Sequence, residues 1–212
     1  MKIFFYTSLL LLTGLISCTD THKQPSENIQ NISPQPITER NPYASLDQSP
    51  MDMIYWPADY PFLKINHTNA PTPIARVIYS RPHKKGRKIF GNDSTFLCRY
   101  NIPWRLGANE STEFESYMPL EISGKTLSPG RYTMYAIPGE KSWIIAFNSN
   151  IYSWGLQIDS TKDILRVEVP VTISEKVIED FTMVFQQSTE GKTNLVIAWD
   201  SVKLFLPIQK KS

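Results

Sequence analysis

The sequence predicts an all-β domain, a single antiparallel β-sandwich with a jelly-roll or immunoglobulin-like layout. Three observations lead to this fold class. Short runs of β-branched and aromatic residues recur along most of the chain. Turn residues separate these runs at short spacing, and only residues 174–179, with Ser174 as a possible N-cap, indicate a helical turn. The 212 residues also suffice for one domain with a sizeable core.

The expected strands are defined by their residue types and by the turn signals at their ends. Residues 74–79 are rich in β formers, and residues 112–115 alternate as a half-buried strand does. Residues 55–57 and 60–62 contain proline, which cannot pair in a central strand, so we expect irregular segments that cover an edge of the core. The remaining expected strands are residues 131–137, 143–147, 164–169, 181–185, 195–199 and 202–206.

The chain opens with the features of an exported lipoprotein. Lys2 supplies a positive charge, and residues 3–12 form an apolar stretch that is shorter than the roughly 20 residues needed to span a bilayer. The stretch leads to Leu15-Ile16-Ser17-Cys18, which resembles a bacterial lipobox. We therefore expect a lipoprotein signal over residues 1–18, with Cys18 lipidated as the membrane anchor. An ordinary cleaved signal with a chance cysteine is the alternative.

The residues after Cys18 predict a tether and a location. Residues 19–50 are mostly Ser, Thr, Asn, Gln, Pro and charged residues without apolar periodicity, so we expect a flexible tether before a β-sandwich at residues 51–208. Thr19 stands where aspartate would signal retention in the inner membrane. The resemblance to bacterial lipoproteins thus favours the outer membrane of the cell envelope, with its periplasmic and surface faces both open.

Composition narrows the classes of partner. The 22 Lys+Arg and 20 Asp+Glu nearly balance, so the electrostatic footprint of a nucleic-acid-binding protein is missing. Cys18 and Cys98 are the two cysteines, and a lipidated Cys18 cannot pair, so we expect no internal disulfide and a buried Cys98. The histidines share no ligand spacing, and we expect neither a metal nor a cofactor. They are His22, His67 and His83.

A series of motifs runs in order through the expected domain. They are Tyr79-Ser80-Arg81-Pro82, Lys85-Gly86-Arg87-Lys88-Ile89-Phe90-Gly91, Trp104-Arg105-Leu106-Gly107-Ala108-Asn109-Glu110, Pro129-Gly130-Arg131-Tyr132-Thr133, Ile137-Pro138-Gly139, Trp154-Gly155, Asp163-Ile164-Leu165-Arg166-Val167 and Ala198-Trp199-Asp200. Together these motifs resemble the family of domain of unknown function 2911. The resemblance implies an exported protein or lipoprotein of the kind found in Bacteroidota, and it assigns no activity.

Residues 81–88, the basic segment, form the one dense cluster of positive charge in the sequence. Its candidate ligand-binding residues are Arg81, Lys85 and Arg87. Guanidinium groups bind carboxylates and phosphates through paired hydrogen bonds, so the segment could hold an acidic glycan, a lipid headgroup or a phosphorylated small molecule. The alternative is a solvated loop.

A second candidate site lies between Trp104 and Glu110. Trp104, Arg105, Asn109 and Glu110 supply an indole, a guanidinium, an amide and a carboxylate, which are the ingredients of a recognition pocket or an acid/base site. Gly107 would permit close approach of a ligand. The alternative is structural: Trp104 packs in the core, Arg105 pairs with Glu110, and Asn109 closes a turn.

Three functions remain open from the sequence. The first is a binding module for a small acidic ligand, a glycan or an envelope partner, with the ligand near both arginine-bearing segments. The second is an envelope hydrolase or lyase in which Glu110 is the general acid or base and Arg105 stabilises an anion. The third is a structural envelope lipoprotein with an exposed apolar patch. The absence of a recognisable nucleophile motif favours the first.

Overall fold

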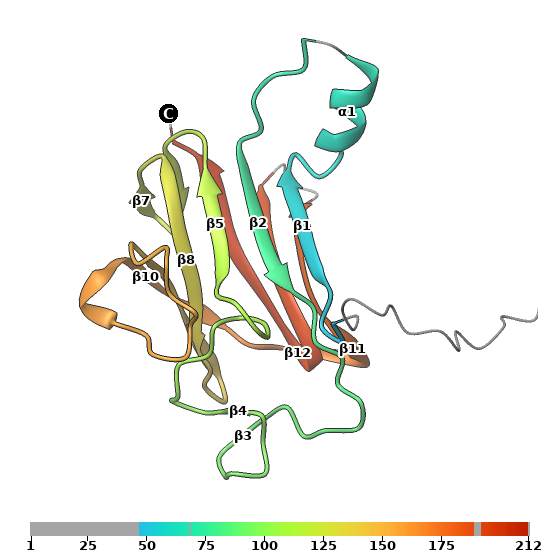
Figure 1. Ribbon diagram of the computed structural model, residues 1–212, viewed down its shortest axis with the longest axis vertical. Helices are drawn as coiled ribbons and strands as arrows, with labels where there is room; N and C mark the ends of the chain where they lie inside the picture. Colours follow the sequence, from blue (N-terminus) through green and yellow to red (C-terminus); the bar gives the residue numbers. More distant parts are fainter. Residues whose placement is uncertain (1–46, 68, 189–191, 212) are drawn as a thin grey trace, which may run out of the picture. The chain divides into compact units, whose positions relative to one another are not determined.

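The computed structural model describes residues 47–67, 69–188 and 192–211. Over these residues the chain forms two antiparallel sheets that face each other, and the predicted all-β sandwich is confirmed (Figure 1). The expected lipoprotein signal and residues 19–46 of the expected tether lie outside the described residues. None of the helices in the described part of the chain is long and apolar enough to cross a membrane.

The larger sheet has six strands in the order β1-β2-β5-β8-β9-β10, so its strands follow one another across the sheet as they do along the chain. Each neighbouring pair is antiparallel. Side chains alternate between the core and the outer face, most plainly in β5 and β10. The strands are β1 (Met51–Trp56), β2 (Ala75–Ser80), β5 (Thr112–Ser116), β8 (Gly130–Ile137), β9 (Ser142–Asn148) and β10 (Asp163–Pro170).

The smaller sheet has four strands in the order β11-β12-β6-β7. Its members are β6 (Leu120–Ile122), β7 (Lys125–Leu127), β11 (Thr172–Gln187) and β12 (Thr193–Lys210). Ser123 and Gly124 connect β6 to β7 with φ angles of 47° and 78°. Positive φ at both central residues is what a two-residue hairpin of type I′ requires, so this turn sets the register of the pair.

The short elements correct two expectations about proline. Residues 55 and 56 belong to β1, which pairs with β2 at the edge of the sheet and ends before Pro57. Residues 60–62 belong to a helix, α1 (Tyr60–Asn66), because a proline in the first turn of a helix removes no hydrogen bond. The other short elements are a parallel pair, β3 (Phe90–Gly91) and β4 (Cys98–Arg99), and a 3₁₀ helix, η1 (Ser160–Lys162).

The predicted helical turn at residues 174–179 is wrong, because these residues lie inside β11. The pairing of β11 with β12 shifts register between Ile173 and Ile178 and again before Thr182. Such irregularities interrupt the two-residue alternation by which a strand is recognised. The two strands expected at residues 195–199 and 202–206 form the single strand β12.

Side chains from both sheets form one core. It includes a group of aromatic rings whose nearest centroids lie 4.7 to 6.1 Å apart, of which Phe90 and Trp104 are partly buried. Cys98 is buried as expected, and burial raises the pKa of its thiol to about 12. The aromatic group consists of Phe90, Trp104, Trp143, Phe181 and Trp199.

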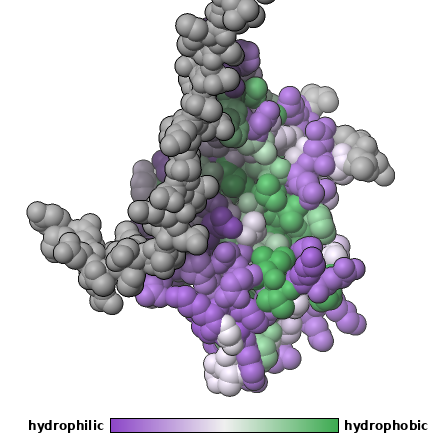
Figure 2. All heavy atoms as spheres, turned by 90° about the vertical axis from the view of Figure 1, so that its right-hand side faces the viewer, coloured by the Kyte–Doolittle hydropathy of each residue, from purple (hydrophilic) through white to green (hydrophobic). Residues whose placement is uncertain are grey.

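The edge strands β1 and β11 lie side by side along one side of the sandwich. Met51 and Met53 of β1 and Val184 of β11 are exposed there. Figure 2 views this side and shows a band of apolar side chains bordered by polar ones. Exposed apolar side chains therefore lie on both edge strands, β1 and β11.

Candidate functional site

Arg81 follows β2 directly and links the two sheets. Its Nη1 lies 3.2 Å from Oδ2 of Asp52 in β1. Its Nε donates a hydrogen bond to the carbonyl of Phe181 at 3.2 Å, and its Nη2 donates to the hydroxyl of Thr182 at 3.1 Å, both in β11. The guanidinium of Arg81 is thus bound by protein groups on three sides.

Other members of the basic segment are also paired with protein groups. Nζ of Lys84 lies 3.0 Å from Oδ1 of Asp200 in β12. The backbone N–H of Lys85 donates to Oε1 of Glu179 at 2.7 Å, and its ammonium donates to Oε1 of Gln48 at 2.7 Å. The segment therefore fastens the end of β2 to the smaller sheet, while residues 85–88 remain exposed.

Next to the basic segment, the surface encloses a hollow of about 300 Å³. We call it the Arg105 hollow. It brings together three of the seven predicted ligand-binding residues, whereas Arg81, Lys85, Asn109 and Glu110 do not line it. The two arginine-bearing segments therefore meet in space, through Arg87 instead of Arg81. Its walls include Arg87, Leu97, Trp104, Arg105, Gly107 and Leu156.

Arg105 is the most unusual residue of the hollow. Its side chain is half-buried, and no acidic side chain among the described residues forms an ion pair with it. Its Nη1 is buried and has no hydrogen-bond partner in the described part of the chain. Burial lowers the pKa of this guanidinium from its ordinary value. A buried donor without a partner is costly, so this group would gain from an anion.

Arg87 supplies the second guanidinium of the hollow. Its Nε donates a hydrogen bond to the carbonyl of Lys84 at 3.0 Å, and its Nη2 donates to the carbonyl of His83. Both acceptors are neutral backbone groups, so the positive charge of Arg87 is oriented without being neutralised by them.

Trp104 belongs to the core as well as to the hollow. Its ring stacks on Trp199 with a centroid distance of 5.7 Å. Its backbone pairs with Ala136 of β8, and its indole N–H donates to the carbonyl of Gly107 at 3.0 Å. These contacts fix the backbone directly before Arg105, which also lines the hollow. The packing role expected for Trp104 in the structural alternative is thus present.

The turn after Arg105 explains the position of the glycine. Leu106 and Asn109 have φ angles of 55° and 60°. A Cβ on Gly107 would lie 3.0 Å from the carbonyl oxygen of Ser80. The close approach at Gly107 is therefore made by the chain's own β2 backbone, where the sequence had indicated a ligand.

Asn109 and Glu110 do not join Arg105. The side-chain amide of Asn109 donates to Oδ2 of Asp47. Glu110 is exposed and forms no ion pair with any described residue, so the internal Arg105–Glu110 pair of the structural alternative is also missing. Although Asn109 and Glu110 follow Arg105 by only four and five positions, neither lines the hollow.

Residues 149–159 contribute a wall that sequence reasoning missed. Gly155 lies so close to Arg105 that a Cβ there would be 2.8 Å from Cβ of Arg105 and 2.7 Å from Oγ of Ser111. The hydroxyl of Ser111 donates to the carbonyl of Ser153 at 2.7 Å and so ties this loop down. Leu156, 74% exposed, adds an apolar wall. The Trp154-Gly155 motif was the available signal for this loop.

The chemistry of the hollow is cationic and apolar. The described residues that line it include no carboxylate, histidine or cysteine. Within the described ranges no group of three or more His, Cys, Asp or Glu side chains could hold a metal ion. Two guanidinium groups beside leucine side chains suit an anion that carries an apolar portion.

Comparisons with known proteins place the chain in a family. Comparisons with curated proteins and with solved structures found no match. The family model described as "Protein of unknown function (DUF2911)" matches residues 64–208. The matched range contains the basic segment, the Trp104 to Glu110 segment and the loop at Gly155. Because the match spans more than half of the 212 residues, this chain belongs to the DUF2911 family of proteins of unknown function.

Proposed function

We propose that this protein is a binding module whose Arg105 hollow takes a small organic anion. The observation that carries the proposal is the half-buried guanidinium of Arg105, which has a buried Nη1 without a partner and forms no ion pair with an acidic side chain among the described residues. A carboxylate or phosphate would supply the missing acceptor and the missing charge. Charge-assisted hydrogen bonds of this kind are about twice as strong as neutral ones.

The surroundings of Arg105 define the class of anion. Arg87 adds a second positive charge at the same hollow, and its backbone contacts hold its guanidinium in a fixed direction. Leu97 and Leu156 are both exposed and line the hollow. Their apolar surface favours a ligand with a hydrocarbon or aromatic group next to its acid, because that group would cover leucine side chains from water.

Binding is better supported than catalysis. A hydrolase or lyase needs a base or nucleophile within hydrogen-bond reach of the bound ligand. Glu110, the general acid or base of the enzymatic alternative, is exposed and does not line the hollow. No other carboxylate replaces it among the described lining residues.

Calorimetry with simple probes tests the proposed function. The full chain is titrated with phenyl phosphate and benzoate, and with benzyl alcohol as the neutral control. We expect saturable binding of the two anions alone. Arg105→Met keeps the aliphatic stem but removes the charge, and it should weaken binding roughly tenfold or more. Arg99→Met, an exposed arginine of β4 outside the hollow, is the matched control and should bind as the wild type does.

The apolar wall has its own test in the same assay. Leu156→Ser should weaken phenyl phosphate binding while leaving inorganic phosphate binding unchanged, since inorganic phosphate has no apolar portion. The proposed function would be contradicted if the wild type and Arg105→Met bound phenyl phosphate and benzoate with equal affinity.

For location, we propose that the protein is exported and anchored in the cell envelope, with the outer membrane favoured, through lipid on Cys18. The support is the lipobox-like Leu15-Ile16-Ser17-Cys18 after an apolar stretch too short to span a bilayer. Cys18→Ala should move the protein out of the detergent phase in a phase-separation experiment. Unchanged partition of the variant would rule out the lipid anchor.

A further inference from the structure

A second cavity, of about 620 Å³, lies at the other end of β1 from the Arg105 hollow. Trp56, at the end of β1, lines this cavity, whereas Ser49, just before β1, lines the Arg105 hollow. The register of β1 and β2 places the Trp56–Ala75 pair at one end of the two strands and the Met51–Ser80 pair at the other. The two cavities are therefore independent sites.

The cavity arises where inward-facing rows of the core change from apolar to polar. In β11 the row of Phe181, Met183 and Phe185 continues with Gln187. Phe181, Met183 and Phe185 are buried, while Gln187 is exposed. The sandwich therefore ends in an opening with an apolar floor and a polar rim.

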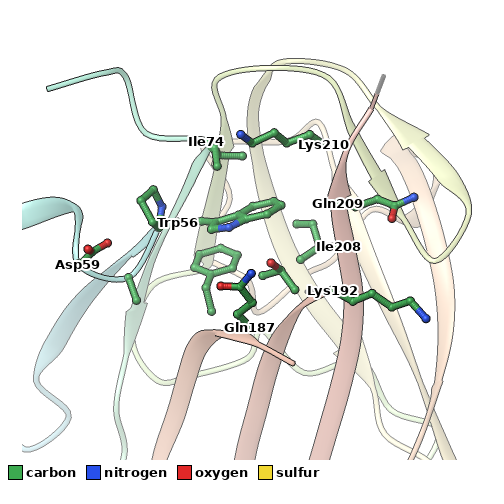
Figure 3. A pocket seen from close by; sticks show the side chains of 12 residues that line it. Trp56, Asp59, Ile74, Gln187, Lys192, Ile208, Gln209 and Lys210 are labelled. Carbon is green, nitrogen blue, oxygen red and sulfur yellow. The ribbon is translucent and has the colours of Figure 1, made fainter. Parts of the chain in front are cut away.

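The same change occurs in β12, on the other wall. Its row of Leu204, Leu206 and Ile208 is buried and continues with Lys210, which is exposed. Figure 3 shows Lys210 and Gln187 extending toward Trp56 from different sides of the cavity.

Trp56 forms the aromatic part of the cavity. Its ring stacks on Phe185 with a centroid distance of 5.9 Å and an angle of 20° between the planes. In Figure 3 the ring lies across the cavity between β1 and β12. The stacking partner holds the indole in place, so Trp56 offers a rigid aromatic surface to a ligand.

The polar groups of the rim are both donors and acceptors. Asp59, Gln187 and Lys210 line the cavity, and their side chains form no hydrogen bond or ion pair with a described residue. Figure 3 shows the side chains of Gln209 and Lys192 directed away from Trp56. One carboxylate and two ammonium groups belong to the lining, and in Figure 3 the ammonium of Lys210 and the amide of Gln187 are the polar groups beside Trp56.

We propose that this cavity binds a neutral saccharide of one or two sugar units. The C–H face of a pyranose ring is apolar and packs on an indole, while its hydroxyl groups both donate and accept hydrogen bonds. An amide and an ammonium beside one aromatic ring, with a carboxylate in the same lining, match that pattern. The lining includes a carboxylate, Asp59, which the described lining of the Arg105 hollow lacks and which disfavours anions. The volume lies in the usual range for ligand pockets of roughly 300 to 1,000 Å³.

The test is titration of the full chain, in a detergent without a sugar headgroup, with five neutral disaccharides. The probes are maltose, cellobiose, lactose, xylobiose and di-N-acetylchitobiose, with binding detected by saturation-transfer NMR and measured by calorimetry. We expect saturable binding of at least one of them. Gln187→Ala should weaken that binding about three- to tenfold, the loss expected for one hydrogen bond.

Matched variants make the result specific. Gln186 is also exposed and adjacent in β11, but it points to the opposite face, so Gln186→Ala should leave affinity unchanged. Trp56→Ala should abolish binding, and Gln187→Ala keeps the test valid if that variant does not fold. Arg105→Met should bind sugar normally. The proposal is overturned by no saturable binding of any probe, by equal losses in Gln186→Ala and Gln187→Ala, or by loss of sugar binding in Arg105→Met.

Discussion

Replacing Gly155 by alanine tests how the loop at residues 149–159 holds Arg105. Gly155 has a φ of +80°, and a Cβ there would lie 2.7 Å from Oγ of Ser111 and 2.8 Å from Cβ of Arg105. Attractive carbon contacts begin at roughly 3.5 Å, so both distances are repulsive. The Ser111 hydroxyl can rotate only by losing its bond to the Ser153 carbonyl, and Cβ of Arg105 can move only with its backbone.

The expected loss of stability has two parts. A left-handed φ at a residue with a Cβ costs about 1 to 2 kcal/mol, and overpacking costs about 1 to 3 kcal/mol more. Gly124 isolates the first part, because its φ is +78° and no described residue other than its chain neighbours lies within 4 Å of the position of its Cβ. Gly155→Ala should therefore lower the free energy of unfolding by about 1 to 3 kcal/mol more than Gly124→Ala does.

Thermal unfolding of the two variants measures this difference. For a domain of this size, 1 kcal/mol corresponds to roughly 2 to 4 °C, so we expect the midpoint of Gly155→Ala to fall several degrees below that of Gly124→Ala. Anion binding should weaken in Gly155→Ala and stay unchanged in Gly124→Ala, since only the methyl group at position 155 displaces Arg105. Equal midpoints for the two variants would refute the packing of Gly155 on Arg105.

Other predictions follow from contacts elsewhere in the fold. Arg81→Met removes a link between the sheets and should lower the free energy of unfolding by about 1 to 3 kcal/mol, against about 0.5 kcal/mol or less for Lys85→Met, in urea unfolding. Burial raises the pKa of Tyr79 from 10.0 to about 12, so the unfolded chain loses this proton first as pH rises. Stability present below pH 10 should decline between pH 10 and 12, and less steeply in Tyr79→Phe. Deleting residues 19–46 should leave the thermal midpoint unchanged, whereas deleting residues 19–50 should lower it, because residues 48 and 50 accept hydrogen bonds from the basic segment.

Regular strands could be predicted from the sequence because local signals decide them. Residues 131–137 and 143–147 are rich in apolar and aromatic residues and lie on either side of Pro138-Gly139. They form β8 and β9, and each observed strand exceeds the expected range by no more than one residue at either end. Residues 174–179 do not show the alternation of apolar and polar residues that marks a strand, because the pairing of β11 with β12 is irregular there. Pro61 concealed α1, because proline in the first turn of a helix reads like a break.

The site was predicted in part. Sequence chemistry includes Arg87, Trp104 and Arg105 among its seven candidate binding residues, and these three line the hollow. It could not separate them from Arg81, whose guanidinium is bound by groups about 30 and 100 positions away in the chain. Side chains at neighbouring positions of a loop can point in different directions, so closeness in the sequence does not show which of them line one hollow.

The apolar walls of the hollow could not be predicted from local sequence. Leu97 and Leu156 are isolated leucines in loops, and only the tertiary fold places them beside Arg105. The same holds for the cavity at Trp56, where Gln187 and Lys210 meet from the ends of two long strands. Such sites depend on register, which the sequence leaves open.

The most direct test of the proposed binding function observes Arg105 itself. The side-chain N–H signals of the arginines are recorded by ¹⁵N NMR while phenyl phosphate is added to the full chain, and they are assigned with Arg105→Met and Arg99→Met. We expect the Arg105 signal to shift to saturation, the Arg87 signal to follow the same curve, and the Arg99 signal to stay in place. An unmoved Arg105 signal, or shifts of equal size at all exposed arginines without saturation, would contradict it.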